Sequence, residues 1–162
     1  MPATTTQQTF SNELVCTEMP SMTLPGTVRV LLDAHLKERR TTQRLRIPDE
    51  LIDDVLLATS ELVNNACEAT PYAAITFKGI LERQAIWIGV WDSSREEPRP
   101  RRVLVEVDDI APDANCLNEG YEPSDIGGWG IPIVMTLCPA EDRDITWTNN
   151  PSGKWVWARF RF

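Results

Sequence analysis

Three short stretches of this chain carry side chains that can do chemistry together. The first, 60–66, places Glu61 and Asn65 four residues apart, so that on a helix both side chains lie on one face. An asparagine offers a neutral carbonyl oxygen to Mg²⁺, which keeps several waters and takes few protein ligands. A carboxylate one turn away can orient a metal-bound water or accept a proton. On spacing alone, an ordinary solvated helix edge is the simpler interpretation.

Of the other two stretches, one is at the end of a strand and the other lies just before a helix. The aliphatic strand 85–92 closes on Asp92, which has the same parity as Ile88 and Val90 and should therefore point toward the same layer. A carboxylate there needs a partner, and it can accept a hydrogen bond from the amino group of adenine. The glycines of 127–130 let backbone amides approach phosphates at a helix N-terminus. Both stretches are also typical of plain turns.

Composition narrows the function classes. The 162 residues suffice for one domain with a real core, and no apolar run approaches the length of a membrane span. The N-terminus lacks a secretion signal, which favours a cytoplasmic protein. Four scattered cysteines and a single histidine form no recognisable zinc motif. The net charge of −8 disfavours direct contact with nucleic acid or an anionic membrane. A triphosphate would therefore have to be held by a cation and by local backbone amides.

Hydrophobic patterning predicts the elements that must position these groups. Residues 1–9 are expected to be disordered, and 10–162 to form one domain with a lid at about 93–127. Within it we expect strands at 10–17, 73–83, 85–92, 144–148 and 154–162, and helices at 26–40, from 48 onward, and at 130–137. This order predicts an α+β fold: a two-layer α/β sandwich with a mixed, mostly antiparallel sheet and three helices on one face.

Two faces within these elements matter for function. The second helix should bury one apolar stripe, with polar residues gathered at its border: Asp54, Glu61, Asn65 and Glu68. His35 on the first helix is expected to be a surface or rim residue rather than a ligand. Alternation in the last strand and in 85–92 gathers Trp87, Trp91, Trp155 and Trp157 with Arg159 and Arg161 on the face opposite the core. This composition predicts a protein contact surface, with Trp–Arg stacking or cover by the termini as alternatives.

Taken in order, these pieces resemble the Bergerat-type (histidine-kinase-like) ATPase domain, particularly the small anti-sigma factor serine/threonine kinases. The resemblance covers about residues 10–162. Segment 60–66 is similar to the family's N box, 90–94 to its first glycine box, 128–131 to its second, and 152–158 to its closing strand. No P-loop or Rossmann motif is present. The resemblance implies the Bergerat fold, with ATP and Mg²⁺ as cofactors.

The same resemblance implies a role for each matched residue. Asn65 would be the Mg²⁺ ligand, Glu61 the base that activates a water or hydroxyl, and Asp92 the carboxylate that recognises adenine. The ATP contacts of the two glycine boxes would come from Ser94, Gly128, Gly130 and Ile131. The chain departs from the family at Ser94, where a glycine is usual, and at Ala69, where a histidine is common. Trp129 stands where a basic residue is frequent.

The function implied is that of a cytoplasmic regulatory protein that binds Mg-ATP and phosphorylates or binds a partner. In the family, the partners are a sigma factor and its antagonist, and a homodimer is a further expectation. A non-catalytic protein-interaction module with the same fold and little nucleotide binding is the alternative. A detached sensor-kinase catalytic domain fits less well, because no phosphoacceptor helix pair is evident.

Overall fold

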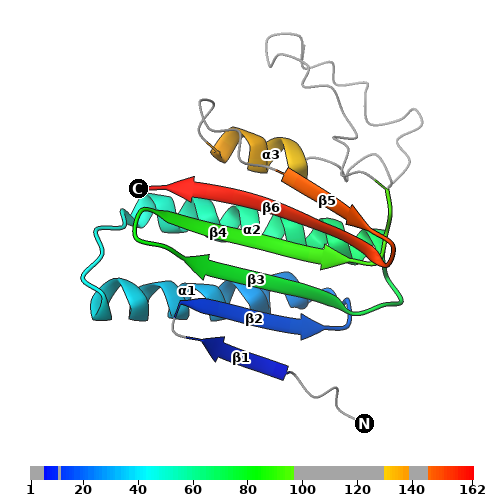
Figure 1. The fold of residues 1–162 in the computed structure, drawn as a ribbon, viewed down its shortest axis with the longest axis horizontal. Helices are drawn as coiled ribbons and strands as arrows, with labels where there is room; N and C mark the ends of the chain where they lie inside the picture. Colours follow the sequence, from blue (N-terminus) through cyan, green and yellow to red (C-terminus); the bar gives the residue numbers. More distant parts are fainter. Residues whose placement is uncertain (1–5, 11, 97–129, 139–145) are drawn as a thin grey trace, which may run out of the picture.

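The computed structural model describes residues 6–10, 12–96, 130–138 and 146–162. These contain six strands and three helices (Figure 1). The strands are β1 (Thr6–Phe10), β2 (Glu13–Glu18), β3 (Ile75–Leu81), β4 (Ala85–Asp92), β5 (Thr146–Asn150) and β6 (Gly153–Arg161). The helices are α1 (Leu24–Thr42), α2 (Asp49–Ala69) and α3 (Gly130–Leu137). The region expected to form the lid, about 93–127, lies mostly outside the described residues.

The strands form one sheet in the order β1-β2-β3-β4-β6-β5. Helices α1 and α2 lie side by side across one face, and α3 joins this layer by packing on α2 (Figure 1). The predicted two-layer α+β arrangement is thus confirmed. The expectation of a mixed sheet was wrong for the described strands, because every neighbouring pair is antiparallel. Three of these pairs are hairpins, whose short connections allow only antiparallel pairing.

The N-terminal prediction also needs correction. Residues 6–9 were expected to be disordered, but Thr6–Phe10 forms β1, and the predicted first strand is β2. Thr6 pairs with Thr17, and Phe10 with Glu13, along the outer edge of β2. Threonine suits a pleated backbone, and pairing satisfies the peptide groups that β2 would otherwise leave open at the sheet edge. A Thr/Gln-rich composition therefore concealed an edge strand.

Helix α2 forms the centre of the helical layer. Pro48 precedes its first residue, and Asp49 and Glu50 supply negative charge to the first turn, where the helix dipole favours it. Of its predicted stripe, Leu51 is half-buried and the other positions are buried: Ile52, Val55, Thr59, Leu62, Val63 and Ala66. Ala58 is buried as well. These side chains belong to one core with the inward faces of β3, β4 and β6, in which Phe77 and Phe160 are among the largest fully buried side chains. Burial of this stripe is what orients the polar border residues of α2.

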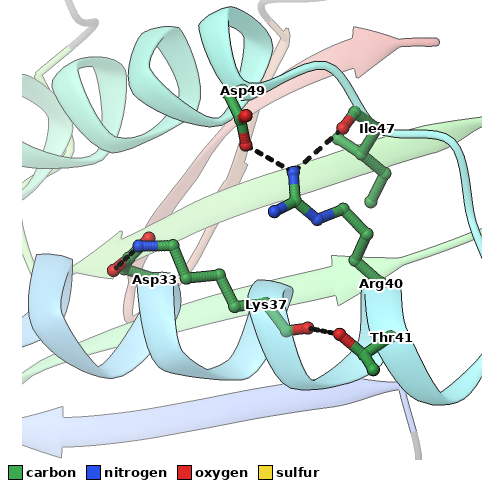
Figure 2. Close-up of polar contacts among 6 residues, drawn as sticks. All are labelled: Asp33, Lys37, Arg40, Thr41, Ile47 and Asp49. Carbon is green, nitrogen blue, oxygen red and sulfur yellow. Dashed lines mark hydrogen bonds and ion pairs between the residues drawn. The ribbon is translucent and has the colours of Figure 1, made fainter.

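A polar clamp holds the end of α1 against the start of α2. The Arg40 guanidinium donates from one nitrogen to the Ile47 carbonyl oxygen at 3.2 Å and to an Asp49 carboxylate oxygen at 2.5 Å (Figure 2). This contact lowers the pKa of Asp49, first through the hydrogen bond and then through the charge of Arg40. One turn earlier on α1, Lys37 and Asp33 form an exposed i, i+4 ion pair at 2.7 Å. The clamp fixes where α2 begins and hence the register of its polar border.

His35 is buried in α1, although the sequence favoured a surface or rim position. Its neighbours Leu32 and Leu36 face the core, and the backbone of Asn12, just before β2, forms a hydrogen bond with the ring. Burial lowers the pKa of His35, and the charge of Arg39 acts in the same direction. Helical periodicity placed His35 at the margin of the apolar stripe of α1. Its contact with Asn12, between β1 and β2, is a tertiary contact that this periodicity does not predict.

The buried histidine predicts an acid-sensitive contribution to stability. Because the pKa of His35 is lowered on folding, the unfolded chain binds this proton more readily than the folded one. The stability that the neutral, buried His35 contributes is therefore fully present above the pKa of about 6.5 in the unfolded chain. It is lost as the pH falls below that value. Urea unfolding between pH 7.5 and 5 should show stability falling by at most about 1.4 kcal/mol per pH unit from this group. A His35→Leu variant should lack that part of the slope, and an unchanged slope would contradict this assignment.

Candidate functional site

The topology brings the ends of α2 and β4 to the same end of the molecule. Helix α2 ends at Ala69 and β3 begins at Ile75, so a short link joins them there. Because β4 returns antiparallel to β3, with Trp91 opposite Thr76, Asp92 lies at the end where α2 stops (Figure 1). Asn65 belongs to the last turns of α2. The helical polar border and the terminal carboxylate of β4 therefore share one end of the helix–sheet layer.

Asp92 is buried and faces the helical layer, as the alternation of β4 predicted. Its Oδ1 accepts a hydrogen bond at 2.8 Å from the Lys154 ammonium and another at 2.8 Å from the Ser94 amide. Its Oδ2 is also buried but has no hydrogen-bond partner among the described residues. Burial raises the pKa of Asp92, and the hydrogen bond and charge of Lys154 oppose that rise. The site thus contains a buried acceptor oxygen that receives no hydrogen bond from the described residues.

Lys154 is the site residue that the motif analysis did not single out. It lies directly opposite Asp92 in the β4–β6 pairing, and the two side chains are only 2% and 1% exposed. A signal was present in the sequence, since the alternation that turns Val156 and Ala158 inward turns Lys154 inward as well. Because a buried lysine is rare unless it is paired, the inward position of Lys154 predicts an acidic partner on the neighbouring strand. Asp92 is that partner.

Glu61 and Asn65 are half-buried at the border of the α2 stripe. Cys67 contacts the backbone of Ser21, which lies just before α1. Cys67 is two residues after Asn65, so the two side chains point about 200° apart around the helix. Asn65 and Glu61 therefore lie on the border that faces away from α1, and α3 packs against α2 as well. Burial raises the pKa of Glu61, and the nearby charge of Glu68 raises it further. A carboxylate with a raised pKa is better suited to accept a proton near neutral pH.

The remaining predicted site residues are only partly described. Ser94 is half-buried: its amide donates to Asp92, and its hydroxyl accepts a hydrogen bond from the Glu96 amide at 3.1 Å. Gly130 is the first residue of α3, as predicted, and Ile131 follows it in the same helix. Gly128 lies outside the described residues. Whether the second glycine box meets Asn65 and Asp92 therefore stays a prediction.

The described residues contain no group of three or more histidine, cysteine, aspartate or glutamate side chains able to hold a metal ion. None of the helices among the described residues is long and apolar enough to cross a membrane. A shallow groove on the described surface follows the first half of α1, far along the chain from every candidate site residue.

In comparisons with known proteins, no protein-family model matches this chain, and no curated protein is significantly similar to it. The assignment of function therefore rests on the chemistry of the site and on the short motifs that carry the resemblance.

The tryptophan face is the second functional candidate, and its predicted members do share one side of the sheet. Trp91 pairs with Trp155 across the β4–β6 ladder, while Trp155 and Trp157 stack with ring centroids 5.0 Å apart. The Arg159 guanidinium lies 4.9 Å from the Trp87 ring centroid, and Lys78 lies 5.5 Å from that of Trp155. The tryptophans are half-buried, and the helices lie across the other face (Figure 1). The Trp–Arg stacking that was the alternative to a contact surface is thus present, on a face that the described helices leave open, and the contact surface stays a prediction.

Gly89 makes this stacked arrangement sterically feasible. A Cβ atom at Gly89 would lie 2.3 Å from the Trp157 ring, so the ring lies flat across β4 only because no side chain is there. We expect Gly89→Val to displace Trp157 and to destabilise the fold by about 1–3 kcal/mol. Gly26→Ala is a matched control, since a Cβ there would meet nothing within 4 Å. Near-ultraviolet circular dichroism and urea unfolding measure both effects, and an unchanged tryptophan signal in Gly89→Val would contradict this role.

Proposed function

We propose that this protein is a Mg-ATP-binding regulator with a Bergerat-type fold, resembling an anti-sigma factor serine/threonine kinase. The observation that supports this most is the unpartnered, buried Oδ2 of Asp92, at the end of the layer where Glu61 and Asn65 lie. A buried acceptor without a partner is costly unless a ligand donates to it. Adenine, with its exocyclic amine, supplies such a donor.

In this proposal, each polar group has a separate task. Asp92 accepts the adenine amine, Asn65 gives its carbonyl oxygen to Mg²⁺, and backbone amides before and at Gly130 approach the phosphates. Glu61 takes the proton from a serine hydroxyl of the antagonist, or from water, as the γ-phosphoryl group leaves ATP. The strongly acidic chain attracts no polyphosphate by its net field, so the cation is essential to binding.

Substitution of Asn65 tests the nucleotide site. We expect Asn65→Ala to weaken Mg-ATP binding roughly a hundred-fold, which corresponds to about 2.7 kcal/mol. Its neighbour Asn64 is the matched control, because it is exposed on the same helix and Asn64→Ala should bind like the wild type. Calorimetric titration with and without EDTA measures both variants. If the wild-type chain binds no Mg-ATP, or if Asn65→Ala binds as tightly as Asn64→Ala, the proposed site is wrong.

The tryptophan face favours a second candidate function, a protein-interaction module with weak or no nucleotide binding. Aromatic side chains interleaved with arginine are enriched in protein interfaces, and this face is not needed to cover the core. The two candidates differ in one measurement. A wild-type chain that folds normally and ignores Mg-ATP supports the module, whereas Asn65-dependent ATP binding supports the regulator and leaves the face as its partner surface.

A further inference from the structure

The buried Lys154 ammonium beside Asp92 has donor capacity that the described residues do not use. Among the described residues, its only hydrogen bond goes to Asp92 Oδ1 at 2.8 Å. An ammonium has further N–H donors, and burial of one without acceptors is costly. The carboxylate beside it has the opposite deficiency, because Oδ2 is a buried acceptor without a donor. One small site thus presents an acceptor and a donor side by side.

We propose that Lys154 determines base specificity: Asp92 Oδ2 accepts the N6 amino group of adenine while the Lys154 ammonium donates to adenine N1. This inference deepens the proposed function and rests on it. Adenine presents a donor, N6–H, directly beside an acceptor, N1, which is the complement of the Oδ2–ammonium pair. Oδ1 cannot substitute for Lys154 in this contact, because a carboxylate oxygen and adenine N1 are both acceptors; Oδ1 instead accepts from Lys154 and from the Ser94 amide.

The same arrangement rejects guanine. In an equivalent pose, guanine O6 would face Oδ2, an acceptor against an acceptor, and its N1–H would face the ammonium, a donor against a donor. Specificity obtained from such mismatches needs no steric exclusion. A free aspartate without Lys154 would instead offer both oxygens to guanine N1–H and N2–H. A carboxylate alone can bind either purine, whereas the ion pair of Asp92 and Lys154 selects adenine.

Structural features hold the pair in this orientation. Asp92 and Lys154 are direct cross-strand neighbours, so the pleat points both side chains to the helical layer. Gly153, immediately before Lys154, lies so close to β4 that a Cβ there would be 2.1 Å from the Asp92 carbonyl oxygen. This approach fixes the start of β6 against the end of β4, and the two side chains are only 2% and 1% exposed.

Nucleotide analogues test the inference on the unmodified chain. Calorimetric titration in Mg²⁺ should show 1-deaza-ATP, which lacks N1, binding about ten- to a hundred-fold more weakly than ATP, the usual range for a charge-assisted hydrogen bond. The control 7-deaza-ATP should bind like ATP, and GTP should bind at least a hundred-fold more weakly. If 1-deaza-ATP binds as well as ATP, the role of Lys154 is wrong although the proposed function stands. If ATP itself does not bind, the proposed function fails first.

Two variants of Lys154 then separate base reading from mere charge neutralisation. Lys154→Met removes the donor, so it should bind ATP and 1-deaza-ATP equally and lose most discrimination against GTP. Lys154→Arg keeps the charge, but its planar fork can bond both carboxylate oxygens and withdraw Oδ2 from the ligand. We expect it to fold like the wild type and to lose at least ten-fold in ATP affinity. An arginine variant with wild-type ATP and 1-deaza-ATP affinities would overturn the inference.

Discussion

Replacing Lys154 with methionine should destabilise the folded protein by about 3–5 kcal/mol at pH 7, among the largest effects of any single substitution in this chain. The cause is not loss of attraction alone. Asp92 is only 1% exposed, and among the described residues it would keep the Ser94 amide as a donor but have no cation to compensate its charge. Chemical unfolding of the whole chain measures the loss.

A paired control distinguishes an uncompensated charge from poor packing. Substituting both partners, Asp92→Leu with Lys154→Met, removes the charge pair entirely, and it should be markedly more stable than Lys154→Met alone. If the double variant is as unstable as the single one, the cost comes from shape rather than from the orphaned carboxylate. Such a result would remove the electrostatic account of this pair.

The Lys154→Met variant should also regain stability as the pH falls. Burial already raises the pKa of Asp92, and removing Lys154 eliminates the main influence that lowers it. Between the ordinary carboxyl pKa and this raised value, the folded state binds more protons than the unfolded state, so acidification stabilises the fold. The stability difference between wild type and variant should therefore shrink below neutral pH. A difference that stays constant down to pH 4 would contradict the assignment.

Substituting Glu61 with glutamine should reduce ATP turnover by about 10²–10⁴-fold while Mg-ATP binding persists, if Glu61 is the proton acceptor. Glutamine preserves the shape and polarity of the half-buried side chain but cannot take a proton at neutral pH. Release of ADP by the isolated chain measures this without a partner, and calorimetry measures the binding. Equal losses in binding and turnover would show that Glu61 holds the ligand rather than activating the nucleophile.

Glu68 provides a milder control on the same helix. Its charge helps to raise the pKa of Glu61, although burial has the larger influence. Glu68→Gln should therefore lower the pKa of Glu61. Because Glu61 then stays deprotonated at lower pH, the acidic limb of the profile of ATP turnover against pH should move to lower pH. A purely structural Glu61 would leave that limb unmoved.

Local hydrophobic patterning in the sequence was sufficient to predict the parts of the fold whose periodicity is strong. The α2 stripe, the start of α2 after Pro48, the bounds of α3 and the hairpin between β3 and β4 all followed from it. So did the inward orientation of Asp92, since a period of two leaves no choice once Ile88 and Val90 are buried. The open tryptophan face is the other half of the same alternation. In each case, the information lies within a few neighbouring residues.

Only the tertiary structure decided which distant residues complete these local features. The His35 ring forms a hydrogen bond with the backbone of Asn12, which lies more than 20 positions earlier in the chain, and β1 pairs along the edge that β2 offers. Lys154 pairs with Asp92 because β6 lies beside β4 in a register that no local pattern encodes, 62 positions along the chain. A single sequence shows that a buried charge needs a partner, since desolvation is costly wherever it occurs. Which residue supplies that partner depends on the pairing of strands, which brings Oδ1 of Asp92 and the ammonium of Lys154 together.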